Sequence, residues 1–227
     1  MGATLQWRNE PVGRVDRSFG ATVRFGSGSD AGTGYLAYSD RVGPGVVILH
    51  DGTGVEPWCT QLADALNDDG FTVLVPDLLA GGEPSPDPAR LPDGVAPDDA
   101  VRRAGVALDH LVDNWHPRAG VVGFGPGAEL AVRLAGEREV DALVLYSGVA
   151  ADLPDVPVAG HYPAADDALA RRAEAVFARA AARGSEVELY VYEGAPRAWP
   201  NPRAGDPDGD AALSLERTTE LFHYHLS

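Results

Sequence analysis

A strand, a glycine turn and the start of a helix follow one another at residues 121–130, which read Val121-Val122-Gly123-Phe124-Gly125-Pro126-Gly127-Ala128-Glu129-Leu130. The β-branched residues favour a strand, and the glycines favour a tight turn before the helix. In an α/β protein, such a turn leaves the carboxyl end of a strand, where a nucleophile or a phosphate group would lie. We therefore take this stretch as the organising feature of the chain.

On both sides of this stretch, continuous apolar runs alternate with helical patterns from Gly45 onward, which is typical of a parallel sheet covered on both faces. The patterns predict strands at 21–25, 33–38, 46–49, 71–75, 120–124, 141–146, 156–161 and 187–192, and helices at 57–67, 101–115, 128–135, 169–180 and 211–226. We expect Asp98 or Asp99 to cap the second helix. The fold class predicted is α/β, a doubly wound and mostly parallel sheet of about seven or eight strands flanked by helices. Residues 1–20 are interpreted as an N-terminal edge segment and 21–227 as a single domain.

Composition excludes several classes of partner. The 18 basic residues are all arginines and face 34 acidic ones, for a formal net charge of -16. Such a charge repels nucleic acids and anionic lipids, so we expect no nucleic acid and no membrane as partner. The single cysteine, Cys59, excludes an internal disulfide, and residues 1–17 lack the apolar core of a signal peptide. We expect a cytoplasmic protein, either a monomer or a dimer.

Several segments of this sequence resemble those of a known family. They are Gly45-Val46-Val47-Ile48-Leu49-His50-Asp51, Val75-Pro76-Asp77-Leu78, Val122-Gly123-Phe124-Gly125, residues 161–166, and Tyr192-Glu193-Gly194-Ala195. Their order and spacing resemble the α/β-hydrolase fold and, more narrowly, the dienelactone hydrolase family, over about residues 20–226. The resemblance implies a hydrolase whose cysteine or serine nucleophile lies at a sharp strand-to-helix turn.

At the positions that the resemblance marks, the usual catalytic residues are replaced. Gly125 takes the place of the nucleophile, and Pro126 takes the place of the residue whose backbone N–H would bind the oxyanion. Arg197 takes the place of the histidine base, and Gly81 that of a substrate-binding arginine, while the acid is kept as Asp166. No serine has glycines two residues before and after it, so no displaced nucleophile motif exists. The resemblance therefore implies a degenerate triad.

We expect such a chain to bind a small organic ligand in a vestigial active-site pocket, either without catalysis or with non-covalent acid/base chemistry of the isomerase, cyclase or lyase type. The candidate catalytic residues are Asp166, His161 and Asp51, and the candidate ligand-binding residues are Arg197, Cys59, Ser147, Trp199 and Gly125. His161 and Asp51 follow predicted strands, and a histidine near Asp166 could act as a base.

Each candidate also has a structural interpretation. A lone histidine is more often a core or surface residue, and a lone cysteine is more often a small buried apolar one. The helix dipole would favour the thiolate of Cys59 if the residue were reactive. Arg197 could form a salt bridge with Asp166, and Gly125 with Pro126 could make the turn a stable connector.

Three alternatives stay open. The first is a hydrolase of esters or lactones that uses a non-standard set drawn from His50, Asp51, Cys59, Ser147 and His161. The second is nucleotide binding, because residues 123–128 match G-x-G-x-x-A between a strand and a helix, although the next strand ends Tyr146-Ser147 without the expected acid. The third is a structural or partner-binding protein.

The remaining expectations concern ions and a loop. We predict no cofactor and no metal, because His223 and His225 are two residues apart on a helix and point to different faces. Residues 79–98 hold five prolines and no periodicity. Because this segment leaves the carboxyl end of a strand, we interpret it as a possible lid.

Overall fold

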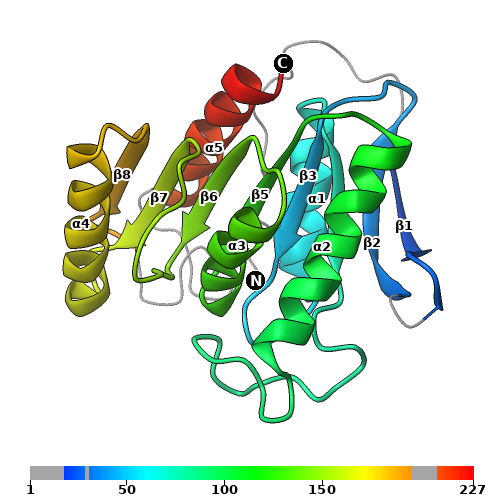
Figure 1. Cartoon of the computed structure of the whole chain (residues 1–227), viewed down its shortest axis with the longest axis horizontal. Helices are drawn as coiled ribbons and strands as arrows, with labels where there is room; N and C mark the ends of the chain where they lie inside the picture. Colours follow the sequence, from blue (N-terminus) through cyan, green and yellow to red (C-terminus); the bar gives the residue numbers. More distant parts are fainter. Residues whose placement is uncertain (1–17, 29–30, 196–208) are drawn as a thin grey trace, which may run out of the picture.

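The structure, a computed structural model, describes residues 18–28, 31–195 and 209–227. Its described part contains one sheet with helices on both faces (Figure 1). The strands are β1 (Ser18–Phe25), β2 (Gly32–Ser39), β3 (Gly45–Leu49), β4 (Thr72–Pro76), β5 (Ala119–Phe124), β6 (Ala142–Tyr146), β7 (Val158–Pro163) and β8 (Val187–Tyr192). The helices are α1 (Pro57–Asp68), α2 (Pro97–Asn114), α3 (Pro126–Glu137), α4 (Asp167–Ala182) and α5 (Asp210–Leu226).

The eight strands lie in the order β1-β2-β4-β3-β5-β6-β7-β8. Strands β3 to β8 all run parallel to one another. β1 and β2 lie at one edge, where β2 is antiparallel to both β1 and β4. This confirms the predicted fold class. Since β3, β5, β6 and β7 are parallel neighbours, the loops that follow them emerge at the same edge of the sheet.

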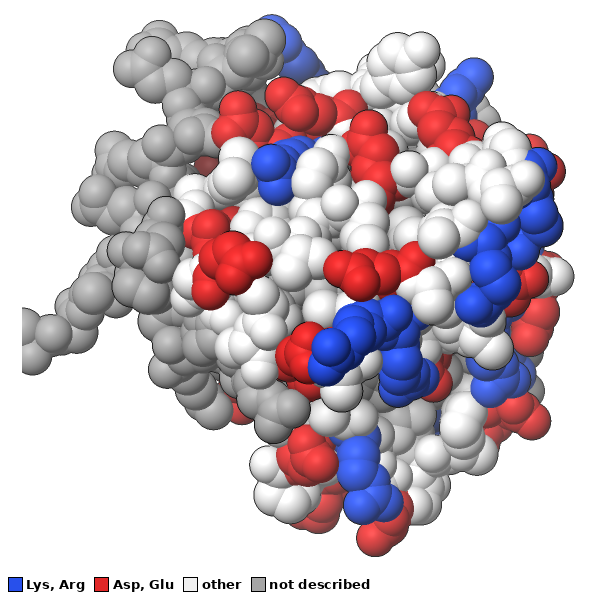
Figure 2. Space-filling view, turned by 90° about the vertical axis from the view of Figure 1, so that its left-hand side faces the viewer, with Lys and Arg blue, Asp and Glu red and all other residues white. Residues whose placement is uncertain are grey.

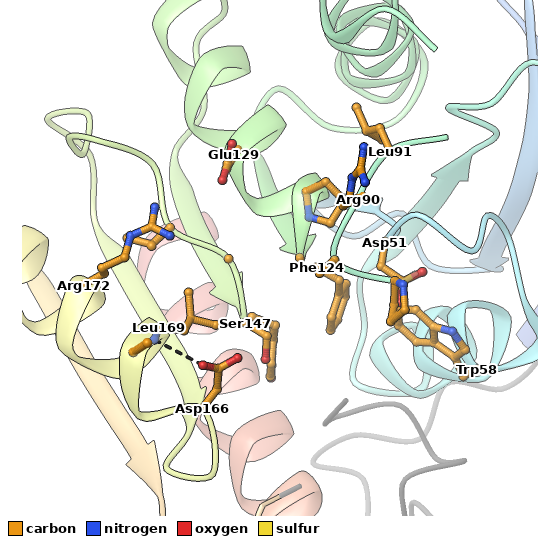
Figure 3. A pocket seen from close by; sticks show the side chains of 18 residues that line it. Asp51, Trp58, Arg90, Leu91, Phe124, Glu129, Ser147, Asp166, Leu169 and Arg172 are labelled. Atoms are coloured by element: carbon orange, nitrogen blue, oxygen red, sulfur yellow. Dashed lines mark hydrogen bonds between the residues drawn. The ribbon is translucent and has the colours of Figure 1, made fainter. Parts of the chain in front are cut away.

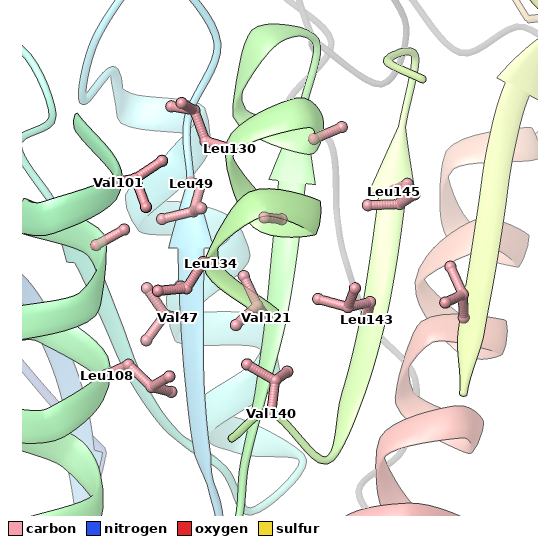
Figure 4. Close-up of a cluster of buried hydrophobic side chains, with 14 of the residues drawn as sticks. Val47, Leu49, Val101, Leu108, Val121, Leu130, Leu134, Val140, Leu143 and Leu145 are labelled. Atoms are coloured by element: carbon pink, nitrogen blue, oxygen red, sulfur yellow. The ribbon is translucent and has the colours of Figure 1, made fainter. Parts of the chain in front are cut away.

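The core consists of two apolar layers, one on each face of the sheet. Helices α2, α3 and α4 cover one face, and α1 and α5 cover the other (Figure 1). Within β3, Val47 and Leu49 pack under α2 and α3, whereas Val46 and Ile48 point to the opposite layer. Figure 4 shows the first layer around Val47, Leu49 and Val121. Full burial of each such side chain contributes about 1.5–3 kcal/mol, so the central strands are held from both sides.

Some element boundaries differ from those expected. β1 begins at Ser18, so strand pairing starts three residues before the predicted Ala21. The N-cap of α2 is Ala96 and not Asp98 or Asp99, because Pro97 occupies the first helical position and leaves both aspartates in the first turn. There the two carboxylates still lie near the positive end of the helix dipole.

Acidic side chains and arginines are intermixed on the surface (Figure 2). Five ion pairs join described residues at exposed sites: Arg102–Asp99, Arg133–Asp98, Arg138–Asp109, Arg171–Asp167 and Arg183–Asp152. Exposed pairs of this kind contribute at most about 1 kcal/mol each, so stability rests on the two apolar layers. Of the helices described, none is both long and apolar enough to span a bilayer.

Candidate functional site

A pocket of about 550 Å³ opens at the edge of the sheet where β3, β5, β6 and β7 end (Figure 3). Its lining comes from loops after these strands, from α1, α3 and α4, and from the segment between β4 and α2. The lining residues are Asp51, Trp58, Pro88, Ala89, Arg90, Leu91, Phe124, Gly125, Pro126, Glu129, Tyr146, Ser147, Gly148, Val149, Asp166, Ala168, Leu169 and Arg172. The pocket therefore lies at the place where α/β sheets bind ligands.

The turn between β5 and α3 brings Gly125 into this pocket. Gly125 has φ +53° and ψ -119°, a conformation that residues with side chains rarely adopt. Its N–H donates to the Tyr146 carbonyl (2.8 Å), and its own carbonyl accepts from the Ala128 N–H (3.1 Å). Pro126 then provides the first residue of α3 and has no N–H to direct at a ligand.

Close packing fixes this turn. A Cβ atom at Gly127 would lie 2.3 Å from the Leu49 carbonyl oxygen, and one at Gly148 would lie 2.0 Å from that of Gly125. Both distances are far below van der Waals contact, and the neighbours are backbone atoms. The sequence thus keeps glycine where β3, β5 and β6 meet the start of α3, and this packing positions Gly125.

Asp51 lies directly after β3 and is 7% exposed. Its Oδ1 accepts hydrogen bonds from the backbone N–H (2.9 Å) and the hydroxyl of Thr53. These two bonds fix the side chain, and Asp51 lines the pocket as a buried carboxylate.

Ser147 and Asp166 line the pocket from the loops after β6 and β7. Asp166 caps α4, with its Oδ1 accepting from the Leu169 N–H (3.3 Å). Ser147 follows β6 with φ +50°, in the left-handed region that a serine seldom occupies. Its N–H donates to the His161 carbonyl (3.1 Å), so main-chain pairing between the ends of β6 and β7 holds it there. The structure therefore brings four candidates together, namely Asp51, Gly125, Ser147 and Asp166; their roles stay predictions.

The segment between β4 and α2 forms one wall of the pocket. The Pro88 carbonyl accepts from the Gly52 N–H (3.1 Å), and the Gly52 carbonyl accepts from the Ser85 N–H (2.8 Å). Asp77 receives the N–H groups of Leu79 and Gly81, each at 2.9 Å, at the start of the segment. The proline-rich segment is thus packed against the loop after β3; that it opens and closes as a lid stays a prediction.

His161 does not lie beside Asp166 in the pocket, contrary to our expectation. It is fully buried within β7, which continues to Pro163, and its ring stacks between Tyr146 (centroids 4.6 Å apart) and Tyr190 (5.3 Å). Its Nδ1 lies 2.8 Å from the hydroxyl of Tyr192. Burial, with a smaller contribution from Arg217, lowers its pKa to about 3.

Both ring nitrogens of His161 have a hydroxyl neighbour. Nδ1 lies 2.8 Å from the Tyr192 hydroxyl, to which Arg217 also donates (3.1 Å), and Nε2 lies 3.4 Å from the Thr218 hydroxyl. The neutral imidazole donates through one ring nitrogen and accepts through the other. His161 is a core histidine that supports Tyr146, and not an accessible base.

Two further candidates are buried away from the pocket surface. Cys59 is fully buried in α1, and this burial raises the pKa of its thiol instead of favouring the thiolate. His50 is also fully buried; its Nε2 accepts from the Leu78 N–H (3.1 Å), and burial lowers its pKa. Neither residue lines the pocket.

Arg197 and Trp199 lie outside the described residues, so their expected part in ligand binding, and the pairing of Arg197 with Asp166, stay predictions. Within the described ranges, no group of three or more histidine, cysteine, aspartate and glutamate side chains is arranged to hold a metal ion. Nucleotide binding by residues 123–128 likewise stays a prediction.

Several lining residues were not predicted from the sequence. Phe124 and Tyr146 stack at 4.7 Å and Trp58 meets Phe124 edge-on at 4.8 Å, so three aromatic rings form one wall. Phe124 and Tyr146 are paired across β5 and β6. Each immediately precedes a predicted site residue, Gly125 or Ser147, and this position in the sequence could have identified them as lining residues. Arg172 lies about one turn beyond Leu169 on the same face of α4, so helical periodicity could have identified it as a lining residue.

The sheet order, the glycine turn after β5 and the pocket above it define an α/β-hydrolase fold. The model of the dienelactone hydrolase family matches residues 33–226, so the chain belongs to the dienelactone hydrolase family. The comparison with curated proteins finds no match.

Solved structures similar to this chain share its fold at low sequence identity. A putative dienelactone hydrolase from Klebsiella pneumoniae subsp. pneumoniae has a TM-score of 0.76 at 20% identity, over 91% of this chain and 99% of the other. A dienelactone hydrolase from Anabaena variabilis has a TM-score of 0.74 at 20% identity, over 92% and 99%. A dienelactone hydrolase-like promiscuous phosphotriesterase from metagenomic libraries gives the same four values.

Proposed function

We propose that this protein binds a small organic molecule in the pocket above Gly125 and forms no covalent acyl intermediate there. The observation that carries the proposal is the turn after β5, which opens into the pocket but presents Gly125 where the family resemblance places the nucleophile. A glycine cannot attack a carbonyl carbon. Pro126 removes one oxyanion donor, a loss that costs about 2.7–4 kcal/mol of transition-state stabilisation where such a donor has been deleted.

The pocket has the size and lining of a small-molecule site. Its volume of about 550 Å³ lies within the range of roughly 300–1,000 Å³ that ligand pockets occupy. Trp58, Phe124 and Tyr146 supply apolar surface, and the carboxylates and guanidinium groups around them supply orientation. This combination of an apolar wall with a few polar groups is typical of ligand recognition.

Any chemistry in this pocket would run through carboxylates. None of the described lining residues is a histidine, and His50 and His161 are both buried and hydrogen-bonded elsewhere. Asp51, held by Thr53, is the group best placed to move a proton, which an isomerase, cyclase or lyase step requires and which needs no covalent nucleophile.

Hydrolysis through a different residue is the second candidate, and the backbone of Ser147 favours it. A serine at φ +50° on the pocket wall is a strained position, and strain of this kind gathers at functional sites. Ser147 would attack with Asp166 as the only acid/base group from the neighbouring strand end. Turnover of p-nitrophenyl esters or lactones that Ser147→Ala abolishes would establish this candidate.

Binding is tested by thermal denaturation against a library of small organic molecules. A ligand at a hundredfold excess over its Kd stabilises the folded state by about 2.7 kcal/mol. We expect hits to raise the Tm of the wild type and of Ala175→Trp, an exposed control on α4 outside the pocket. They should have no effect on Ala168→Trp, which places an indole at the pocket wall. Hits that stabilise all three proteins equally would refute the proposal.

A further inference from the structure

One carboxylate oxygen in the pocket has no hydrogen-bond partner among the described residues. Asp51 is 7% exposed, and both of its hydrogen bonds, from the N–H and the hydroxyl of Thr53, go to Oδ1. Among the described residues, no donor meets Oδ2 and no arginine or histidine lies within ion-pair distance of Asp51. Because Asp51 lines the pocket, a ligand bound there comes within reach of its carboxylate.

A buried charge needs a counter-charge or hydrogen-bond donors to offset its lost hydration. The protein supplies two donors, both to the same oxygen. Arg90 and Arg172 line the pocket too, but they are exposed, so water screens their charges. A ligand therefore encounters the Asp51 charge at close range and with little screening, and it encounters the two guanidinium groups mostly through solvent.

The surroundings of Asp51 favour a positive ligand over a neutral donor. Trp58 lies on the same side of the pocket as Asp51 (Figure 3), and its ring meets that of Phe124 at 4.8 Å, with Tyr146 stacked beyond. The faces of aromatic rings attract cations, most strongly when the cation is removed from water. Tyr146 is stacked on both faces, by Phe124 and by His161, so this attraction falls to Trp58 and Phe124. The formal net charge of -16 also favours the approach of cations.

We infer that the pocket takes an organic cation whose N–H groups donate to the Asp51 carboxylate and whose apolar body lies against Trp58, Phe124 and Tyr146. This inference rests on the proposed small-molecule function and names the class of its ligand: an amine, amidine or guanidine on a small apolar or planar body.

Three ligands of matched shape test the charge requirement. Benzamidine is a planar cation, benzamide is its neutral counterpart and benzoate is the anion. Isothermal calorimetry with the wild-type protein should show binding of benzamidine, with benzamide at least roughly tenfold weaker and benzoate weaker still. This comparison needs no variant and so does not depend on the folding of one.

Asp51→Asn then tests the residue. The amide keeps the shape and an oxygen that Thr53 can donate to, but it has no charge. Benzamidine binding should weaken by roughly thirtyfold or more, while benzamide binding stays unchanged. The control is Asp113→Asn, an exposed position on α2 with the same change in net charge, and it should leave benzamidine binding intact.

The outcomes separate this inference from the function on which it rests. Binding of benzamide or benzoate as tight as that of benzamidine would overturn the cation inference and leave small-molecule binding in place. Benzamidine binding that survives Asp51→Asn would overturn it too. If none of the three ligands binds at millimolar concentration, the inference is also wrong, and the library experiment alone then decides the proposed function.

Discussion

The carbonyl oxygen of Pro88 lies 3.2 Å from the point where a Cβ atom of Gly125 would be. The segment between β4 and α2 thus approaches the turn after β5 closely at the position that the family resemblance assigns to a nucleophile. Among the described residues, its chain neighbours aside, the other heavy atom within 4 Å of that point is Cβ of Asp51, at 3.7 Å. The local packing therefore suits a glycine, and a larger residue would require the segment to move slightly.

Restoring a hydroxyl at this turn should not restore hydrolysis. We expect Gly125→Ser to lower the free energy of unfolding by about 1–3 kcal/mol, because its φ of +53° strains a residue with a side chain. The new serine would find Pro126 in place of an N–H donor, and no histidine among the lining residues that the structure describes. Denaturant unfolding and p-nitrophenyl acetate turnover measure the two effects, with Gly125→Ala as control for the strain. Substantial hydrolysis by Gly125→Ser alone would contradict this account.

The packing of the loop after β3 can be tested at Gly52. A Cβ atom there would lie 1.9 Å from the carbonyl oxygen of Arg90, so Gly52→Ala must push the proline-rich segment away. We expect faster proteolysis within residues 82–96 and weaker binding of any pocket ligand. Gly136→Ala in α3 is the matched control, since a Cβ atom there meets no atom of the described neighbours within 4 Å. That change should stabilise the protein by about 0.5–1 kcal/mol. Unchanged proteolysis and binding in Gly52→Ala would show that the segment does not shape the pocket.

Stability should depend on pH through His161. Burial lowers its pKa from 6.5 in the unfolded chain to about 3 in the folded state. As the pH falls below 6.5, the unfolded chain therefore takes up the proton first. The contribution of neutral His161 to the free energy of unfolding is therefore complete above pH 6.5 and is lost as the pH falls towards 3. The free energy of unfolding decreases by up to about 1.4 kcal/mol per pH unit over this range.

The measurement is denaturant unfolding across this pH range. His161→Gln should be less stable at neutral pH, but its free energy of unfolding should depend less steeply on pH. Burial also lowers the pKa of His50, so His50 accounts for part of the pH dependence that remains in this variant. The exposed His223→Gln should keep the wild-type slope. An identical slope in His161→Gln and the wild type would mean that His161 is not a neutral core residue.

The sequence predicted the sheet and its helices because both leave a periodic signal. Val46 to Leu49 are apolar without interruption because β3 is buried on both faces, and this pattern distinguishes a central parallel strand. The elements were less certain at their ends. Pro97 starts α2 before the two aspartates that were expected to cap it, since a proline is well suited to the first helical position.

The site was only partly predictable. Asp51, Gly125, Ser147 and Asp166 could be placed because each follows a strand, and parallel strand ends meet at one edge. His161 was misplaced because β7 runs two residues beyond it, so the side chain points into the layer under α5 and not toward Asp166. Arg90 could not be found, because the position of a residue in a long non-periodic loop depends on tertiary contacts such as that of Pro88 with Gly52.

The most direct test of the central claim is the intact mass of the wild-type protein after incubation with p-nitrophenyl acetate or a fluorophosphonate. We predict no adduct in the pocket, because Gly125 presents no nucleophile and Cys59 is buried. The non-covalent ligand found by thermal denaturation should still bind the treated protein. A stoichiometric acyl or phosphonyl adduct that maps to the pocket, and that Ser147→Ala removes, would contradict the account and establish covalent catalysis.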